Sequence, residues 1–373
     1  MAIESSEYAE RVERVRARLA ERSLDAVLIT HPTNRRYLTG FTADDIPPNE
    51  SGGHLLISSD AAILVTGAVN VTQAEAQSPH ITVSKRENGW SEDDAAHIKE
   101  QGPGRIAYEP MAMLDGVLRG INARLAEDYI TVEWVDAEEL VEELRAVKSQ
   151  AEIQIIRRAF EITNEAFNEV AAEIAPGQSE REIAWRFHAA MVARGAEGPS
   201  FPIIVAAGEH AARPHHEPGE RLIAPGEPIV IDMGARYEGY CADLTRTVWV
   251  GAPDERLREI YPVVEGAVEA VLERLMPAVD GKALDTSARE HIDARGHGEA
   301  FVHGLGHGVG LRVHESPSAS QTSEDRLLPG HTLTIEPGVY YPEWGGVRIE
   351  DVVLVTEDGF EVLTSGATKL HID

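Results

Sequence analysis

Carboxylates stand inside apolar, strand-like segments of this chain, and a folded interior tolerates that arrangement only if something neutralises them. Asp232 ends the apolar run Pro-Ile-Val-Ile-Asp-Met-Gly, and Asp243 opens the next run, Ala-Asp-Leu-Thr-Arg-Thr-Val-Trp-Val. A two-residue turn at 238–239 would pair these runs as a hairpin with Asp232 opposite Thr245. Asp243 would then lie on the same face as Asp232, one diagonal step away, where the two side chains can converge.

A second pair of apolar, strand-like segments also contains one acid in each segment. The run Leu-Thr-Ile-Glu-Pro-Gly contains Glu336, and the run Gly-Val-Arg-Ile-Glu-Asp contains Glu350. A turn centred on Glu343 would set Glu336 directly opposite Glu350. One acid in an apolar strand is ordinarily satisfied by a neighbouring arginine, but four such acids would be costly unless cations neutralise them. Oxygen-rich ligands with few histidines suit Mn, Co, Fe or Zn, so we expect a two-metal site.

A glycine-rich segment supplies candidate histidines. Residues 301–315 have the sequence Phe-Val-His-Gly-Leu-Gly-His-Gly-Val-Gly-Leu-Arg-Val-His-Glu, which contains His303, His307 and His314. Glycine at every second position from 304 to 310 argues against a helix and for backbone packed close to another element. The spacing of His303 and His307 is therefore not that of a helical zinc pair, and the glycine pattern is not a dinucleotide fingerprint.

Two further residue types need an interpretation. His215 lies in the polar stretch Ala-Arg-Pro-His-His, where a histidine on its own is usually a surface residue. Cys241 is the single cysteine, so no internal disulfide and no thiolate zinc cluster can form, which fits a reducing cytoplasm. We interpret Cys241 as a small packing residue, because nothing in the sequence supplies the partners that a cysteine nucleophile needs.

The charge of the chain is strongly acidic. Asp and Glu total 63 against 34 Lys and Arg, a formal net charge of −29. The excess is spread along the 373 residues, with −12 in residues 1–142 and −17 in residues 143–373. Such a surface repels nucleic acid and anionic membranes, so we expect neither as a partner. We interpret it as adaptation to a salt-rich cytoplasm, with an ordinary acidic protein as the alternative.

The pattern along the chain predicts two domains. Strand-like runs alternate with helical patterns up to about residue 142, which is typical of an α/β domain. Hairpins with helices laid against them follow, which favours an α+β domain. We therefore expect domains at 1–142 and 143–373. The first twenty residues have no apolar run of signal-peptide length, and no run approaches the ~18 apolar residues of a membrane span, so we expect neither secretion nor membrane insertion.

At these residues the chain resembles the pita-bread metallopeptidases, the group of prolidases, aminopeptidases P, methionine aminopeptidases and creatinases. The resemblance implies an α+β pita-bread catalytic domain preceded by a smaller α/β N-terminal domain of the creatinase/prolidase type. Weaker likenesses at 34–41 and 145–153 extend it over essentially the whole chain. The segments that carry it most specifically are 212–218, 231–247, 301–317 and 334–351.

The resemblance implies a ligand set for two divalent metal ions, with Mn²⁺ or Co²⁺ preferred to Fe²⁺ or Zn²⁺. Asp232 would bind one ion, and Asp243 and Glu350 would bridge both. His307 and Glu336 would complete the second ion. A bridging water would become the hydroxide nucleophile.

The resemblance also implies roles for side chains around the metals. Glu336 would carry a proton from the water to the leaving nitrogen. His215 and His314 would stabilise the carbonyl oxyanion and orient the scissile bond. His303 and Arg348 would lie in the substrate pocket, with Arg348 near a substrate carboxylate.

The activity implied is that of a cytoplasmic, homodimeric Xaa-Pro dipeptidase that cleaves the bond before proline in short peptides. Alternatives are an aminopeptidase P acting on longer Xaa-Pro peptides, a C–N hydrolase of the creatinase or ectoine-hydrolase kind, and a pita-bread module that only binds. The intact ligand set disfavours the creatinases and binding modules, and the leading domain disfavours methionine aminopeptidases. Arg312 and His331 depart from the family pattern, which expects an acid and a methionine there.

Overall fold

The computed structural model describes residues 3–43, 45, 50–102, 104–137 and 139–369. The chain divides into two compact units, one formed by Ile3–Arg145 and the other beginning at Ala146. Within the described residues, no helix is both long enough and apolar enough to span a bilayer.

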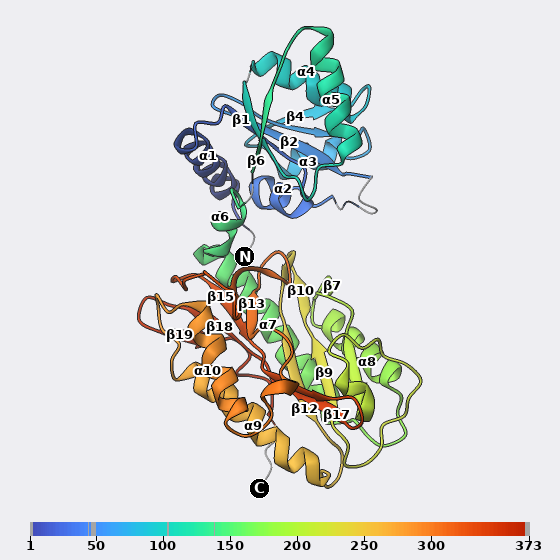
Figure 1. The fold of residues 1–373 in the computed structure, drawn as a ribbon. Helices are drawn as coiled ribbons and strands as arrows, with labels where there is room; N and C mark the ends of the chain where they lie inside the picture. The colour runs from blue at the N-terminus through green and yellow to red at the C-terminus, as the bar shows by residue number, and fades with distance from the viewer. Residues whose placement is uncertain (1–2, 44, 46–49, 103, 138, 370–373) are drawn as a thin grey trace. The chain divides into compact units, whose positions relative to one another are not determined.

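The first unit contains a six-stranded sheet, and helices connect most of its strands along the chain (Figure 1). The strand order is β4-β3-β2-β1-β5-β6, and β1–β2 and β2–β3 are its antiparallel pairs. Its strands are β1 (Ala26–Ile29), β2 (Gly53–Ser58), β3 (Ala62–Thr66), β4 (Thr82–Lys85), β5 (Arg105–Tyr108) and β6 (Glu133–Asp136). Its helices are α1 (Ser5–Glu21), α2 (Pro32–Thr39), α3 (Val71–Gln77), α4 (Trp90–Gln101) and α5 (Asp115–Glu127), and α6 (Glu142–Ala146) runs into the second unit.

The second unit packs short antiparallel sheets against helix pairs. Helices α7 (Gln150–Ala171) and α8 (Glu180–Ala193) share one core with β8, β9 and β12, whereas α9 (Glu255–Leu272) and α10 (Gly281–Asp293) share another with β15 to β18. Helix α7 begins with a capping box between Ser149 and Glu152. The strands are β7 (Gly198–Pro199), β8 (Ile204–Ala207), β9 (Ile229–Met233), β10 (Ala235–Tyr237), β11 (Tyr240–Cys241), β12 (Leu244–Val248), β13 (Gly306–Gly308), β14 (Glu315–Ala319), β15 (Thr332–Ile335), β16 (Gly338–Tyr341), β17 (Gly345–Arg348), β18 (Asp351–Val355) and β19 (Phe360–Val362), with short 3₁₀ turns η1 (Gly208–Ala212) and η2 (Gly298–Ala300).

The first acid-bearing hairpin has the predicted register. Strands β9 and β12 pair with Asp232 opposite Thr245, and Tyr237 pairs with Tyr240 across a two-residue turn. Both turn residues, at 238–239, have positive φ, as a hairpin turn of this length requires.

The second acid-bearing hairpin also has the predicted register. Ile335 lies opposite Asp351 in β15 and β18, and Gly338 lies opposite Arg348 in β16 and β17. Both pairings are symmetric about residue 343. The same symmetry sets Glu336 opposite Glu350, in the gap between the two strand pairs.

The glycine-rich segment is an irregular strand pair rather than a helix. Strand β13 pairs with β14, and the register shifts between His307 and Gly308. A Cβ atom on Gly306 would lie 1.9 Å from the carbonyl oxygen of Thr334 in β15. The close backbone approach predicted from the alternating glycines is therefore confirmed, and beside it the backbone N–H of His307 donates to the hydroxyl of Thr334 at 2.9 Å.

Candidate metal centre

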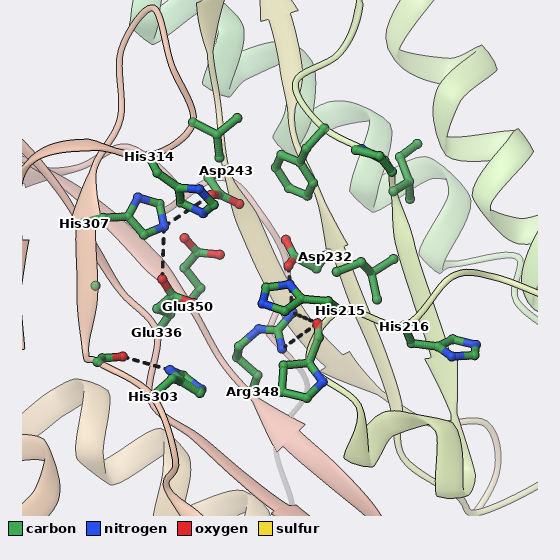
Figure 2. A pocket seen from close by; sticks show the side chains of 18 of the residues that line it. His215, His216, Asp232, Asp243, His303, His307, His314, Glu336, Arg348 and Glu350 are labelled. Atoms are coloured by element: carbon green, nitrogen blue, oxygen red, sulfur yellow. Dashed lines mark hydrogen bonds and ion pairs between the residues drawn. The ribbon is translucent and has the colours of Figure 1, made fainter. Parts of the chain in front are cut away.

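A cavity of about 590 Å³ opens between the hairpins of the second unit. Phe201, Pro202, Ile203 and Ile204 form part of an apolar wall. The predicted site residues contribute the polar lining, and Figure 2 shows most of their side chains turned toward one another. All nine of them line the cavity: His215, Asp232, Asp243, His303, His307, His314, Glu336, Arg348 and Glu350.

Three carboxylates converge at the floor of the cavity. Asp232, Asp243 and Glu350 each offer an oxygen, and these atoms lie within 4.8 Å of one another. Oδ1 of Asp232 and Oε1 of Glu350 are buried and accept no hydrogen bond from the described residues. A buried carboxylate oxygen without a donor is costly, so this arrangement calls for a cation.

The local electrostatics point the same way. Burial, together with the charges of the neighbouring carboxylates, raises the pKa of Asp243 and the pKa of Glu350 well above their usual values. Burial also raises the pKa of Asp232, although the Arg348 guanidinium opposes the shift. These acids therefore resist ionising together unless positive charge is brought in.

His307 and Glu336 form the other half of the cluster. Nε2 of His307 lies 3.1 Å from Oε1 of Glu336 and 3.9 Å from Oδ2 of Asp243. Its Nδ1 lies 3.0 Å from the carbonyl oxygen of Gly308 and would keep its proton there, so a cation would replace the proton that Nε2 shares with Glu336 in the metal-free protein. Burial opposes ionisation of Glu336, yet the hydrogen bond and charge of His307 lower the pKa of Glu336 to about 2.

These donors fit a pair of divalent cations. The two oxygens without donors, the converging carboxylates and the imidazole nitrogen are the ligand types that such ions take in two-metal sites.

The other predicted histidines surround this cluster. Nε2 of His303 lies 2.9 Å from the hydroxyl oxygen of Tyr340, and burial lowers the pKa of His303. The ring of His314 meets the ring of His307 edge to face at 4.3 Å. Burial and the neighbouring His307 lower the pKa of His314, which keeps its ring neutral. His215 projects toward Asp232 from the loop that follows η1 (Figure 2).

Arg348 is committed to protein groups. Its guanidinium donates to Oδ2 of Asp232 at 2.7 Å, to the hydroxyl of Tyr340 at 3.1 Å and to the carbonyl of Pro214 at 3.4 Å. Its Nε donates to the hydroxyl of Thr245 at 3.2 Å. The side chain therefore orients Asp232 from the cavity wall.

Two residues beside this site were not predicted from the sequence. Tyr340 contacts both His303 and Arg348. Its position in β16, on the face that bears the cavity, is the feature of the sequence that could have identified it. His216 was grouped with the polar loop; it also lines the cavity, but its side chain points away from the carboxylate cluster while that of His215 points toward it (Figure 2). Cys241 is buried against the carbonyl of Leu311, in agreement with a packing role.

Comparisons with known proteins cover both parts of the chain. Residues 154–357 match metallopeptidase family M24, and residues 11–147 match the creatinase/prolidase N-terminal domain. A protein of Pyrococcus furiosus named Xaa-Pro dipeptidase is 36% identical over 97% of this chain and 99% of its own length.

Solved structures agree with this result. An Xaa-Pro dipeptidase from Bacillus anthracis superposes with a TM-score of 0.90 at 35% identity, covering 98% of this chain and 99% of its own. An X-Pro aminopeptidase from Thermotoga maritima superposes with a TM-score of 0.84 at 34% identity, covering 95% and 97% respectively. The predicted fold class, a pita-bread catalytic domain after a creatinase/prolidase-type domain, is confirmed. The chain belongs to metallopeptidase family M24.

Proposed function

We propose that this metallopeptidase is a dimetal Xaa-Pro dipeptidase that hydrolyses the peptide bond before proline. The observation that carries the proposal is the convergence of Asp232, Asp243 and Glu350, with two buried oxygens that accept no hydrogen bond from the described residues, on a cavity large enough for a short peptide. The names of the relatives from Pyrococcus furiosus and Bacillus anthracis support the same substrate class.

Five side chains would hold the ions. Asp232, Asp243 and Glu350 would supply the carboxylates at the floor, and His307 and Glu336 would complete the set, with Mn²⁺ or Co²⁺ ahead of Fe²⁺ or Zn²⁺. Two cations there would polarise the scissile carbonyl and acidify a water molecule for attack.

Glu336 is the proton carrier in this proposal. Glu336 lines the cavity as an ionised carboxylate, so one of its oxygens can accept a proton from the attacking water. It would deliver that proton to the proline nitrogen as the bond breaks, because the departing imide nitrogen needs a proton to leave as an amine.

The surrounding side chains would bind and orient the peptide. A neutral His314 keeps an N–H group that can donate to the carbonyl oxygen, and His215 would act beside it. His303, held by Tyr340, would form part of the substrate wall, and Arg348 would hold Asp232 in its orientation. The apolar residues 201–204 suit a proline ring.

Three further expectations belong to this proposal. The enzyme would work in the cytoplasm, act as a homodimer and take short proline-containing peptides as its partners. An aminopeptidase P activity on Xaa-Pro-Yaa is the alternative that the Thermotoga maritima structure supports, since that protein is named X-Pro aminopeptidase.

The test is hydrolysis of an Xaa-Pro dipeptide and an Xaa-Pro-Yaa tripeptide in molar salt. Apo protein would be compared with protein given Mn²⁺ or Co²⁺, with Glu336→Gln as the inactive variant. Glu343→Gln is the matched control, because that glutamate is exposed in the turn of the same hairpin.

We expect metal-dependent cleavage of the dipeptide that Glu336→Gln abolishes and Glu343→Gln leaves intact. Cleavage of the tripeptide alone would replace the dipeptidase assignment with aminopeptidase P. Stoichiometric metal binding with neither peptide cleaved would move the substrate to non-peptide amides of the creatinase or ectoine-hydrolase kind.

A further inference from the structure

A fully buried glutamate outside the metal cluster ties one loop of the cavity together. Glu180 is the first residue of α8 and has no exposed surface. Its Oε1 accepts hydrogen bonds from the backbone N–H of Ala207 at 2.9 Å and from Nδ1 of His210 at 2.9 Å. Its Oε2 accepts from Nε2 of His216 at 2.9 Å and from the backbone N–H of Gly219 at 3.1 Å.

These four donors bracket one segment of chain, Ala207–Gly219. Ala207 ends β8 and Gly219 closes the loop, so a single carboxylate fastens both ends. His210 and His216 add two attachments from inside the segment, and their rings lie 4.2 Å apart. A connection without regular strand or helix structure over most of its length is otherwise free to move.

The free part of the segment enters the cavity. Pro214 presents its carbonyl to the Arg348 guanidinium, and His215 projects toward Asp232 (Figure 2). His216 points the opposite way (Figure 2), and its Nε2 donates to Oε2 of Glu180. A turn joins the two histidines, because the backbone N–H of His216 donates to the carbonyl of Arg213 at 3.1 Å, so fixing His216 also restrains the turn that carries His215.

The charge on Glu180 suits this task. Burial raises the pKa of Glu180, but the hydrogen bonds from Ala207, His216, Gly219 and His210 together lower it below its usual value. Its place in the first turn of α8 also favours a negative charge. An ionised carboxylate accepts all four donors and offers none, so every contact is complementary.

We propose that Glu180 is a positioning residue that holds His215 in the cavity by fastening the segment Ala207–Gly219 at both ends and through His216. The proposal rests on the proposed function, because the role of His215 is read through peptide hydrolysis.

Glu180, His210 and His216 also offer three ligand atoms within 4.8 Å of one another, which is the spacing of a metal site. We favour the positioning role because each oxygen already accepts one backbone N–H and one ring N–H. A cation would have to displace both ring protons.

The experiment uses Glu180→Gln in the metal-loaded full chain. The matched control is Glu209→Gln, since Glu209 lies in the same segment but pairs outward with Arg221. Hydrogen–deuterium exchange without substrate measures the fastening directly. We expect faster exchange across 207–219 in Glu180→Gln and wild-type exchange in Glu209→Gln. Unchanged exchange in Glu180→Gln would overturn the proposal whether or not the protein cleaves Xaa-Pro.

A double-mutant cycle on turnover separates positioning from general damage. We expect Glu180→Gln to lower kcat by about 10- to 100-fold with KM within about threefold, the size of effect that a small misplacement produces. In a His215→Ala background, Glu180→Gln should lower kcat by less than about twofold, because the side chain that Glu180 positions is already absent. Multiplicative loss in both backgrounds would overturn the proposal.

Two further measurements keep the result interpretable. His216→Gln retains a donor and is the milder variant if Glu180→Gln fails to fold, and we expect the same lack of additivity with His215→Ala. Metal analysis should give the same number of bound metal ions per chain in wild type and in Glu180→Gln. One more metal ion in wild type than in Glu180→Gln would overturn the positioning role and identify Glu180, His210 and His216 as a metal site. No wild-type cleavage of Xaa-Pro peptides would contradict the proposed function, and the exchange measurement would still decide whether Glu180 fastens the segment.

Discussion

We expect Asp243 and Glu350 to destabilise the metal-free protein at the pH where the metal-loaded protein would work. Both carboxylates are buried, and burial and neighbouring negative charge raise the pKa of each. The same side chains that prepare the cluster for cations therefore make the empty cluster costly. Carboxylates buried inside a fold are expected to bind cations well and to lower the stability of the metal-free protein.

Asp243→Asn should separate the two effects. The variant loses a ligand, so we expect metal binding and peptide hydrolysis to fall by at least about 100-fold. The metal-free variant should nevertheless be more stable than metal-free wild type at pH 8 by about 1–3 kcal/mol, because ionising a carboxyl whose pKa folding has raised costs about 1.4 kcal/mol per pKa unit. Urea unfolding in the presence of a chelator measures the difference. Equal or lower stability of the variant would show that the carboxylate is already satisfied without metal.

The pH dependence has a defined sign. A carboxyl whose pKa is raised on folding binds more protons in the folded state, so its contribution to stability is lost as pH rises from its unfolded pKa, about 4, through its folded pKa. Metal-free wild type should therefore lose stability over this range more steeply than Asp243→Asn. Metal binding displaces those protons, so affinity should rise with pH and binding should release protons. Calorimetry in buffers of different ionisation enthalpy measures the release, and a heat independent of buffer would refute this account.

The strand β13 depends on one close approach. A Cβ atom on Gly306 would lie 1.9 Å from the Thr334 carbonyl oxygen, so Gly306→Ala must push β13 away from β15 and carry His307 with it. We expect kcat to fall by about 100-fold. Gly116→Ala is the control, because nothing lies within 4 Å of a Cβ there on α5. That change should leave kcat unaltered and stabilise the protein by about 0.5–1 kcal/mol. Wild-type turnover in Gly306→Ala would show that the strand can shift without moving the histidine.

The two hairpins show what local sequence can determine. Alternation has a period of two residues, and the turns at 238–239 and around 343 fix the register, so the meeting of Asp232 with Asp243 and of Glu336 with Glu350 could be predicted. The glycines before and after His307 likewise predicted backbone packed close to another element, and Gly306 lies against β15 as expected.

Contacts between distant segments could not be predicted in this way. Glu180 meets His216 across 36 residues and Arg348 meets Pro214 across 134. No periodic pattern links such pairs, because their approach is set by how α8, η1 and β17 pack rather than by any one element. The same limit applies to the contacts of Arg348 with Asp232, Tyr340, Thr245 and Pro214, while its place near a substrate carboxylate stays a prediction.

Charge acts on the chain as a whole. The net charge of −29 is shared by both parts of the sequence, and arginines rather than lysines provide most of the positive charge. Many of these arginines form exposed ion pairs, including Arg181 with Glu220 and Arg186 with Glu173. Exposed pairs of this kind stabilise a fold only slightly. The unpaired excess of acids therefore dominates the long-range electrostatics, and its repulsion favours the expanded chain.

Salt should relieve this repulsion. We expect the thermal midpoint of the metal-loaded protein to rise by about 5–10 °C between 0.05 M and 1 M KCl and then to level off, since the screening length is already about 3 Å at 1 M. Sucrose at matched osmolality controls for surface exclusion and should give a smaller rise. Replacing four exposed acids by glutamine, at Glu273, Glu290, Glu324 and Glu357, lowers the repulsion and should shrink the salt response. Full stability at 0.05 M KCl, with no response in either protein, would mean that the acidic surface is not an adaptation to salt.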